Sequence, residues 1–159
     1  MRLALASFSL LLAAGCASHA RRDGPPAIAR FFLESPASDR AAATLPISGV
    51  RIAIAPKPVI TEFDIVNVEI AQVELGKCLV FQLAPAAARD LYRLTASNQG
   101  RRLVLVLDGA AIGARMIERP LEDGAIFTFV ELPDEKLPAL VAGLKRTSVE
   151  LQRAAAGKT

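Results

Sequence analysis

Apolar and polar residues alternate along several short stretches of the chain, whereas two other stretches repeat with the period of a helix. The alternating stretches predict strands over residues 28–34, 50–55, 65–75, 78–83, 101–107, 110–117 and 125–131. Apolar spacing at i, i+3, i+4 and i+7 predicts one helix over residues 85–99 and a second over 133–147. Strands interrupted by two helices predict an α+β fold, in which a mainly antiparallel sheet carries both helices on one face. The other face of the sheet is then either simply exposed to solvent or a binding surface.

Turn-forming residues separate these elements. Gly76–Lys77 is expected to turn the chain between two strands, and a change in apolar parity near Ile70–Ala71 predicts a bulge before it. Asp108–Gly109 is a strong signal for a two-residue hairpin, with the Asp108 side chain bonded to local backbone. Gly100 follows the first helix, at a place where a C′ glycine is common. We therefore expect a positive φ at both Gly100 and Gly109. The Ala-, Ser- and Asp-rich residues 35–44 predict a loop.

The first residues of the sequence predict a secretion signal. A single basic residue, Arg2, precedes an apolar run over residues 3–14, which is shorter than the roughly 20 residues that a permanent membrane span needs. The ending Leu-Ala-Ala-Gly-Cys at Cys16 resembles the lipobox of bacterial lipoprotein precursors, with Ala13 where Leu is usual. The resemblance implies cleavage before Cys16, a diacylglyceryl group on its thiol and an acyl chain such as palmitate on the new amino terminus. The alternative is an ordinary signal peptide cut after Ala14 or after residue 20.

The pattern divides the chain into four parts. Residues 1–15 are the predicted signal peptide, 16–27 a lipidated tether, 28–147 a single α+β domain and 148–159 a frayed tail. Lipid on Cys16 makes the membrane a partner, because several acyl chains at one site anchor firmly. In proteobacterial lipoproteins an Asp after the cysteine signals inner-membrane retention, so Ala17 favours the outer membrane. We expect a lipid-anchored protein of the bacterial envelope that faces the periplasm.

The composition excludes several classes of protein. The 159 residues are 52% hydrophobic and 22% charged, which excludes a disordered chain and suits one domain. Nineteen Lys and Arg against 16 Asp and Glu leave a net charge of +3, too small and too evenly spread to indicate a nucleic-acid partner. Aromatic residues make up 5%, without Trp, so there is little material for stacking on bases or sugars.

The residues that could take part in catalysis or metal binding are scattered along the chain. Cys78 opens an apolar strand and is expected to be a buried structural thiol, and the single histidine, His19, lies in the tether without a partner. No Walker loop, GxSxG or HExxH motif occurs in the sequence. We therefore expect no catalytic residue, no metal site, no cofactor and no small-molecule substrate. The residues that bind a ligand are not identified.

The charged residues favour structural roles over chemistry. Glu69 and Glu74 face opposite sides of their strand and make a poor carboxylate pair. Thr61 is expected to cap a short helical turn, in which Glu62 and Asp64 would at best form a weak cation site. Arg101 and Arg102 point to opposite faces of a strand, one of them as a solvated charge at a sheet edge.

One part of the chain resembles the head subdomain of the periplasmic P1 region of SecD, a subunit that assists bacterial protein translocation. The matching residues are Thr95, Asn98, Gly100, Leu107, Asp108, Gly109, Ile117, Leu121 and Gly124, within a similar segment from about residue 76 to 145. The family often has Pro where this chain has Arg115. No transmembrane helix is expected after Cys16, so the resemblance does not imply the transport motor of that family, which uses transmembrane helices. The resemblance implies the fold and a tendency to meet polypeptides, which is an analogy at the level of the fold.

Three functions remain open. The first is a non-catalytic envelope lipoprotein that binds a protein or an extended peptide, through a sheet edge such as 50–55 or 110–117 or through the face without helices. The second is a structural or assembly component of an envelope or transport complex. The third is an enzyme with an unrecognised site. We also expect the chain to fold without residues 1–27, because these contribute nothing to the predicted core.

Overall fold

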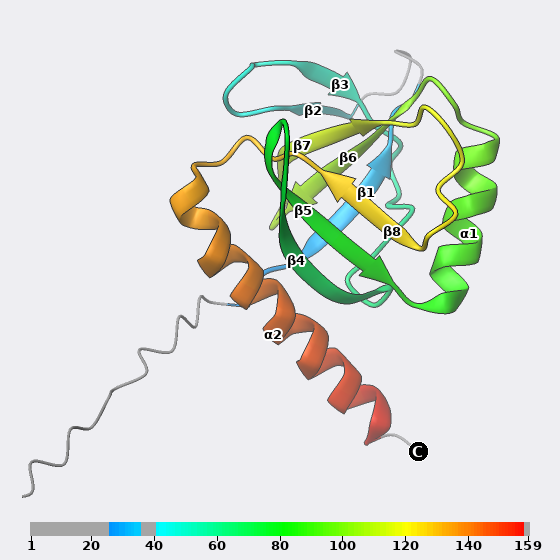
Figure 1. Cartoon of the computed structure of the whole chain (residues 1–159). Coiled ribbons are helices and arrows are strands. Elements are labelled where there is room, and N and C mark those ends of the chain that lie inside the picture. Colours follow the sequence, from blue (N-terminus) through cyan, green and yellow to red (C-terminus); the bar gives the residue numbers. More distant parts are fainter. Residues whose placement is uncertain (1–25, 36–40, 158–159) are drawn as a thin grey trace, which may run out of the picture.

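The computed structural model describes residues 26–35 and 41–157 (Figure 1). The predictions for the signal peptide, Cys16 and His19 lie outside these residues. The elements follow one another as β1 (Ala29–Leu33), β2 (Ala42–Thr44), β3 (Arg51–Ala53), β4 (Ile65–Val73), β5 (Gly76–Leu83), α1 (Pro85–Ala96), β6 (Arg102–Leu107), β7 (Ala110–Met116), β8 (Ala125–Thr128), the short 3-10 helix η1 (Asp134–Lys136) and α2 (Leu137–Ala156).

The strands form two three-stranded antiparallel sheets, in the orders β1-β6-β7 and β4-β5-β8, and the hairpin β2-β3. The two larger sheets pack face to face: the rings of Phe31 on β1 and Phe81 on β5 meet edge to face, with centroids 5.0 Å apart. The α+β fold class and the antiparallel pairing are confirmed. The predicted single sheet is divided into three in the structure.

The main core lies between the two larger sheets and is closed at its sides by the helices. Leu91 of α1 and Leu144 of α2 belong to the same buried cluster as Phe31 and Phe81. In Figure 1, α1 runs along the right of the molecule and α2 runs diagonally from its left side to its bottom. Both helices therefore pack on the inner side of the β4-β5-β8 sheet, because each contributes its apolar stripe to that core.

A second, smaller core lies on the other side of the β1-β6-β7 sheet. Leu45 and Ile52, from the β2-β3 hairpin, pack against Val104 of β6 and Ala111 of β7. Neighbouring residues of a strand point to opposite faces, so β6 supplies both cores: Leu103 and Leu105 face the main core. The hairpin thus covers the middle of the outer side of this sheet, while Phe32 and Val106 on the same side stay half-buried.

Short bridges join the sheets into one body. Phe31 pairs with Ile60, and Gly113 of β7 pairs with Val130 just after β8. A Cβ at Gly113 would lie 2.3 Å from the backbone oxygen of Phe129. Glycine is therefore the residue that lets β7 approach the chain after β8 so closely.

Several predicted boundaries differ from the structure. Residues 42–44, expected to be loop, form β2, which pairs with β3. Val73 pairs with Gly76, so the β4-β5 turn is Glu74–Leu75 and not Gly76–Lys77. The register shift lies between Ile65 and Asn67, and the prediction of a bulge near Ile70–Ala71 is wrong. The alternation of apolar and polar residues changes there because the end of the hairpin extends beyond the core. Val68 is fully buried, whereas Ile70, on the same side of the strand, is 36% exposed.

The helices also differ from the pattern at their ends. Helix α1 ends at Ala96, and Gly100 has the predicted positive φ of 81° but lies in the following turn, where its N–H donates to the carbonyl of Ile117. Gly109 has a φ of 89°, as predicted for the hairpin. Helix α2 continues to Ala156, past the predicted end at 147. Its last two turns contain Glu, Leu, Gln, Arg and Ala, which favour a helix even without burial.

Candidate functional site

The residues that match the SecD pattern hold the end of α1 in place. The hydroxyl of Thr95 is fully buried, donates within α1 to the carbonyl of Leu91 and accepts from the backbone N–H of Leu121 at 2.9 Å. Asn98 donates to the carbonyl of Leu94 at 2.8 Å, which satisfies a carbonyl at the helix end. These contacts tie α1 to the loop before β8. Thr95 and Asn98 of the motif thus have a structural role at this helix end.

Arg101 and Arg102 both bind Glu34. The Arg102 guanidinium pairs with both carboxylate oxygens of Glu34, at 3.0 and 2.7 Å. Arg101 donates to the backbone carbonyl of Glu34 and to Asn98. The expectation that one arginine is a solvated edge charge is wrong, because both are half-buried at the end of β1. The hydrogen bonds from Arg102 hold the pKa of Glu34 below its usual range.

The acidic residues considered for a cation site are occupied by the protein itself. Glu62 forms a two-pronged ion pair with Arg30, at 2.7 and 2.6 Å, which lowers the pKa of the Glu62 carboxyl. Asp64 accepts from both the N–H and the hydroxyl of Thr61, at 2.8 Å each. The carboxylate of Asp64 thus holds the turn in which a Thr61 cap was predicted. The described ranges contain no group of three or more His, Cys, Asp or Glu arranged to hold a metal.

Asp108 has a role that its neighbours in sequence do not reveal. Its φ is 47°, as a primed hairpin turn requires, and its carboxylate accepts from the backbone N–H of Ile28 at 2.9 Å. The prediction that Asp108 bonds local backbone is therefore wrong. Ile28 is distant in sequence but adjacent in space, because β1 pairs with the end of β6.

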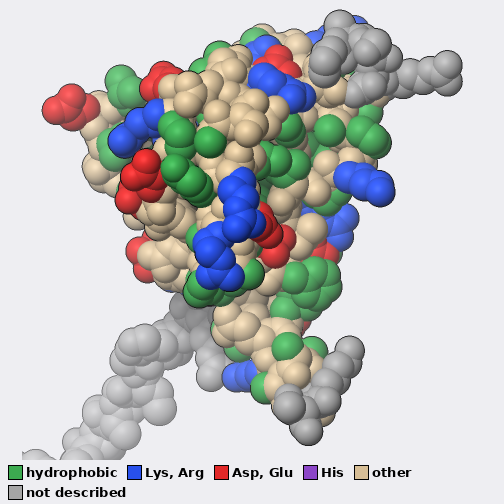
Figure 2. Space-filling view, turned by 90° about the vertical axis from the view of Figure 1, so that its right-hand side faces the viewer, with side chains coloured by type: hydrophobic (Ala, Val, Ile, Leu, Met, Phe, Trp, Pro, Cys, Tyr) green, Lys and Arg blue, Asp and Glu red, His purple; other side chains and the backbone are tan. Residues whose placement is uncertain are grey.

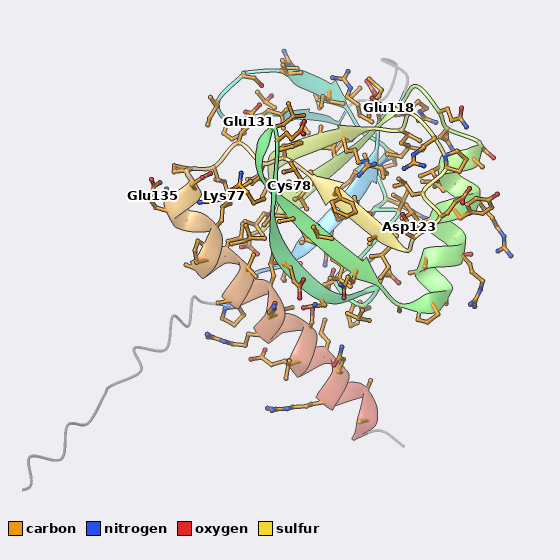
Figure 3. All side chains as sticks on the ribbon, viewed as in Figure 1. Lys77, Cys78, Glu118, Asp123, Glu131 and Glu135 are labelled. Carbon is orange, nitrogen blue, oxygen red and sulfur yellow. The ribbon has the colours of Figure 1, made fainter. Side chains whose placement is uncertain are left out.

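Cys78 lies on β5 near the β4-β5 turn (Figure 3) and is 2% exposed. The thiol is unpaired, and burial raises its pKa. A buried, protonated thiol is a poor nucleophile, which agrees with the structural role expected for Cys78.

The outer side of the β4-β5-β8 sheet is the strongest candidate for a binding surface. No described element passes in front of β5 and β8 in Figure 1. Strand alternation turns Ile126 and Thr128 inward, where they are buried, and Phe127 and Phe129 outward, where they are 43% and 44% exposed. We call this surface the uncovered face; its outward residues are Asn67, Glu69, Ala71, Val73, Val80, Gln82, Ala125, Phe127 and Phe129, whereas Cys78, which alternates with them, is buried.

The uncovered face is apolar in its middle and polar at its borders. Asn67 of β4 donates to Glu69 at 3.0 Å and to Gln82 at 3.3 Å, which makes a polar corner. At the other border, Arg115 of β7 donates to the carbonyl of Phe127 at 3.0 Å. Burial lowers the pKa of the Arg115 guanidinium, which still stays cationic at neutral pH.

A small cavity of about 90 Å³ adjoins this border. It is lined by Arg115, Arg119, Pro120, Leu121, Glu122, Asp123, Ala125 and Phe127. Its mixed charges and small size suit a single polar side chain better than a metabolite. On the adjoining side of the molecule, which α1 covers, basic and acidic side chains are interspersed (Figure 2).

The two strand edges that the sequence offered for strand addition are bonded within the molecule. Ile112 of β7 accepts from Glu131 at 2.7 Å, next to the bridge between Gly113 and Val130. The carbonyl of Ala53 accepts from Ser35 at 2.9 Å. These contacts favour the uncovered face over either edge. The sequence could have indicated this face, because alternation along residues 125–131 places the rings of Phe127 and Phe129 on one side of the strand and Ile126 and Thr128 on the other.

Comparisons with known proteins bear on the fold. No family model and no curated protein sequence matches the chain. Among solved structures, a chain of "a membrane component SecDF that enhances protein export" matches with a TM-score of 0.59 at 18% identity, over 77% of this chain and 63% of the other. The chain has a SecDF-like fold. The resemblance to a SecD periplasmic region is confirmed at this level.

Two further SecDF structures agree. The "super-membrane-facing form" matches with a TM-score of 0.59 at 18% identity, over 77% of this chain and 19% of the other. SecDF of Thermus thermophilus, described as a translocon-associated membrane protein, matches with 0.53 at 17% identity, over 79% and 20%. The chain thus spans 63% of one SecDF chain and about a fifth of the others. The similarity also covers more of this chain than the segment 76–145 that carries the motif.

Within residues 26–35 and 41–157, no helix is both long enough and apolar enough to cross a bilayer.

Proposed function

We propose that this chain is a lipoprotein of the bacterial cell envelope whose SecDF-like domain binds polypeptide segments without catalysing a reaction. The lipid on Cys16 would anchor it facing the periplasm, with the outer membrane favoured. The observation that carries the proposal is the uncovered face, where Phe127 and Phe129 are exposed side by side with Val80 on one side of a sheet.

Two further observations support polypeptide as the ligand and a role without catalysis. One of the SecDF structures is described as a component that enhances protein export, which makes contact with polypeptides a reasonable function for this fold. The acidic side chains that could have served chemistry, Glu34, Glu62 and Asp64, are used in ion pairs and turns.

Binding is tested with the full chain and a polypeptide kept unfolded by reduction and alkylation. A photo-crosslinker replaces Phe127, or Val149 on α2 as the matched control, because the two side chains are 43% and 42% exposed. We expect crosslinks from position 127 to the unfolded polypeptide and few to its folded, disulfide-intact form. Equal yields at 127 and 149, or equal capture of both forms, would contradict the proposal.

The anchor is tested separately by mass spectrometry of the protein extracted from membranes. We expect an amino terminus at Cys16 that carries acyl chains, and release of the protein from membranes in the variant Cys16→Ser. An unmodified amino terminus beyond Cys16 would overturn the lipoprotein part and leave polypeptide binding open to its own test.

A further inference from the structure

The uncovered face carries one row of side chains with opposite charges at its two ends. The strand register places Glu69 of β4, Val80 of β5 and Phe127 of β8 directly opposite one another. The Arg115 guanidinium of β7 lies beside the Phe127 end of this row, because its Nη1 donates to the backbone carbonyl of Phe127 at 3.0 Å. The row is therefore acidic on β4 and apolar on β5 and β8, with a basic group beside its β8 edge.

The charge at the acidic end is available to a ligand. Glu69 is exposed and accepts one hydrogen bond, from Asn67. It takes part in no salt bridge with any other described residue, since the pairs involve other acids. A cationic group above Glu69 would thus meet an acidic side chain without a competing cation.

At the basic end, acidic groups of the protein itself compete with a ligand for Arg115. Arg115 is half-buried and bonded to Phe127, and the carboxylate of Glu118 acts on it electrostatically. Glu122 and Asp123 line the cavity beside it. A ligand carboxylate would be drawn to Arg115 less strongly than a ligand cation is drawn to Glu69, so selectivity should arise chiefly at Glu69.

We propose, on the basis of the polypeptide binding proposed above, that the uncovered face selects extended segments with a definite charge pattern. The segment places Lys or Arg over Glu69, an apolar side chain over Val80 and Phe127, and Asp or Glu beside Arg115. Neighbouring strands lie about 4.8 Å apart and an extended chain advances roughly 3.4 Å per residue, so the two charged residues are about four positions apart.

A polypeptide segment suits this face better than a second copy of the domain. The apolar part of the row is narrow, and Phe127 within it and Phe129 next to it are each less than half exposed. A stable dimer buries about 800 Å² on each partner, with a broad apolar centre. A single extended segment needs only a strip of this width.

The test uses the full chain in detergent and three short fluorescent peptides with the same apolar centre. One carries Lys and Glu four positions apart, one carries Lys at both places and one carries Glu at both. Reversing the order of the charges would be uninformative, because the peptide can bind in the opposite direction. We expect the mixed peptide to bind about threefold more tightly than the Glu–Glu peptide at low salt, with a smaller difference at high salt.

The variant Glu69→Lys supplies the decisive comparison. It makes both ends of the row basic, so the Glu–Glu peptide should now bind most tightly. Glu150→Lys, an equal charge change at an exposed position of α2, should leave the order of the three peptides unchanged. An unchanged order in Glu69→Lys, or the same change in Glu150→Lys, would overturn the charge pattern while peptide binding itself stands.

Two other outcomes have separate meanings. If neither the peptides nor the unfolded polypeptide binds, the proposed function fails and this inference fails with it. If sedimentation shows a dimer that Glu69→Lys dissociates, the uncovered face is an interface between two copies, and the peptide assignment is overturned.

Discussion

The two three-stranded sheets share their inner packing and differ on their outer sides. The outer side of β1-β6-β7 is covered by the β2-β3 hairpin, where Ile52 is 1% exposed against Val104. The outer side of β4-β5-β8 keeps Phe127 and Phe129 more than two-fifths exposed. The same kind of sheet is thus closed in one place and left open in the other. The exposed rings on the open side are the feature on which the proposed binding surface rests.

The largest expected effect separates the covered face from the open one. Ile52→Ala should lower the free energy of unfolding by about 3 kcal/mol, because it leaves a cavity under the hairpin. Phe127→Ala, which removes more atoms from the open face, should cost about 1 kcal/mol, because much of its ring is already in water. Denaturant unfolding of the full chain measures both. Equal losses would contradict the assignment of covered and open faces.

A second substitution tests the junction between the two sheets. Gly113→Ala should destabilise the protein by about 2 kcal/mol, because the new Cβ would lie 2.3 Å from the Phe129 carbonyl oxygen. Gly157→Ala is the control: φ there is −78° and the nearest atom to the added Cβ is 3.5 Å away. Thermal unfolding is the measurement. A Gly113→Ala protein as stable as the control would show that β7 and the chain after β8 can separate without loss.

The ion pair beside the covered face gives a pH prediction. Arg102 lowers the pKa of Glu34, so this carboxylate stabilises the fold above its unfolded pKa, and the contribution is lost as pH falls through the lowered folded pKa. Glu34→Gln should cost about 1.5 kcal/mol at neutral pH and less in acid. Unfolding curves measured from neutral to acidic pH provide the check. A cost that is the same at every pH would argue against an ion pair.

The smallest effect on stability should accompany a large effect on binding. Phe129→Ser should change the free energy of unfolding by about 0.5 kcal/mol and weaken binding of the unfolded polypeptide. Val149→Ser, which alters a side chain 42% exposed on α2, should leave binding unchanged. A polarisation titration with labelled polypeptide distinguishes the two. Loss of binding in both variants would mean that the effect is not specific to the uncovered face.

Strand identity and the tight hairpin were predictable because they depend on neighbours in sequence. Alternation identified the strands of both larger sheets, and Asp108–Gly109 has the positive φ values of a primed turn. Boundaries were less predictable: two of the three residues of β2 are alanines, which are depleted in strands, and pairing with β3 makes them a strand. Likewise, the partner of Asp108 is Ile28, which no local rule brings to it.

The candidate site shows the same division between local and distant contacts. The sequence alone determined that a β-rich domain carries apolar residues on both parities of residues 125–131, and that its motif resembles SecD. Only the tertiary structure decided that the outward side chains of β8, such as Phe127, stay exposed to solvent, while Val104 on the outer side of β6 is covered by the hairpin. It also aligned Glu69, Val80 and Phe127 in one row and brought the Arg115 guanidinium beside the end of that row. Alternation specifies that a side chain points to one face or the other, but which face receives a covering hairpin depends on contacts between segments far apart in the chain.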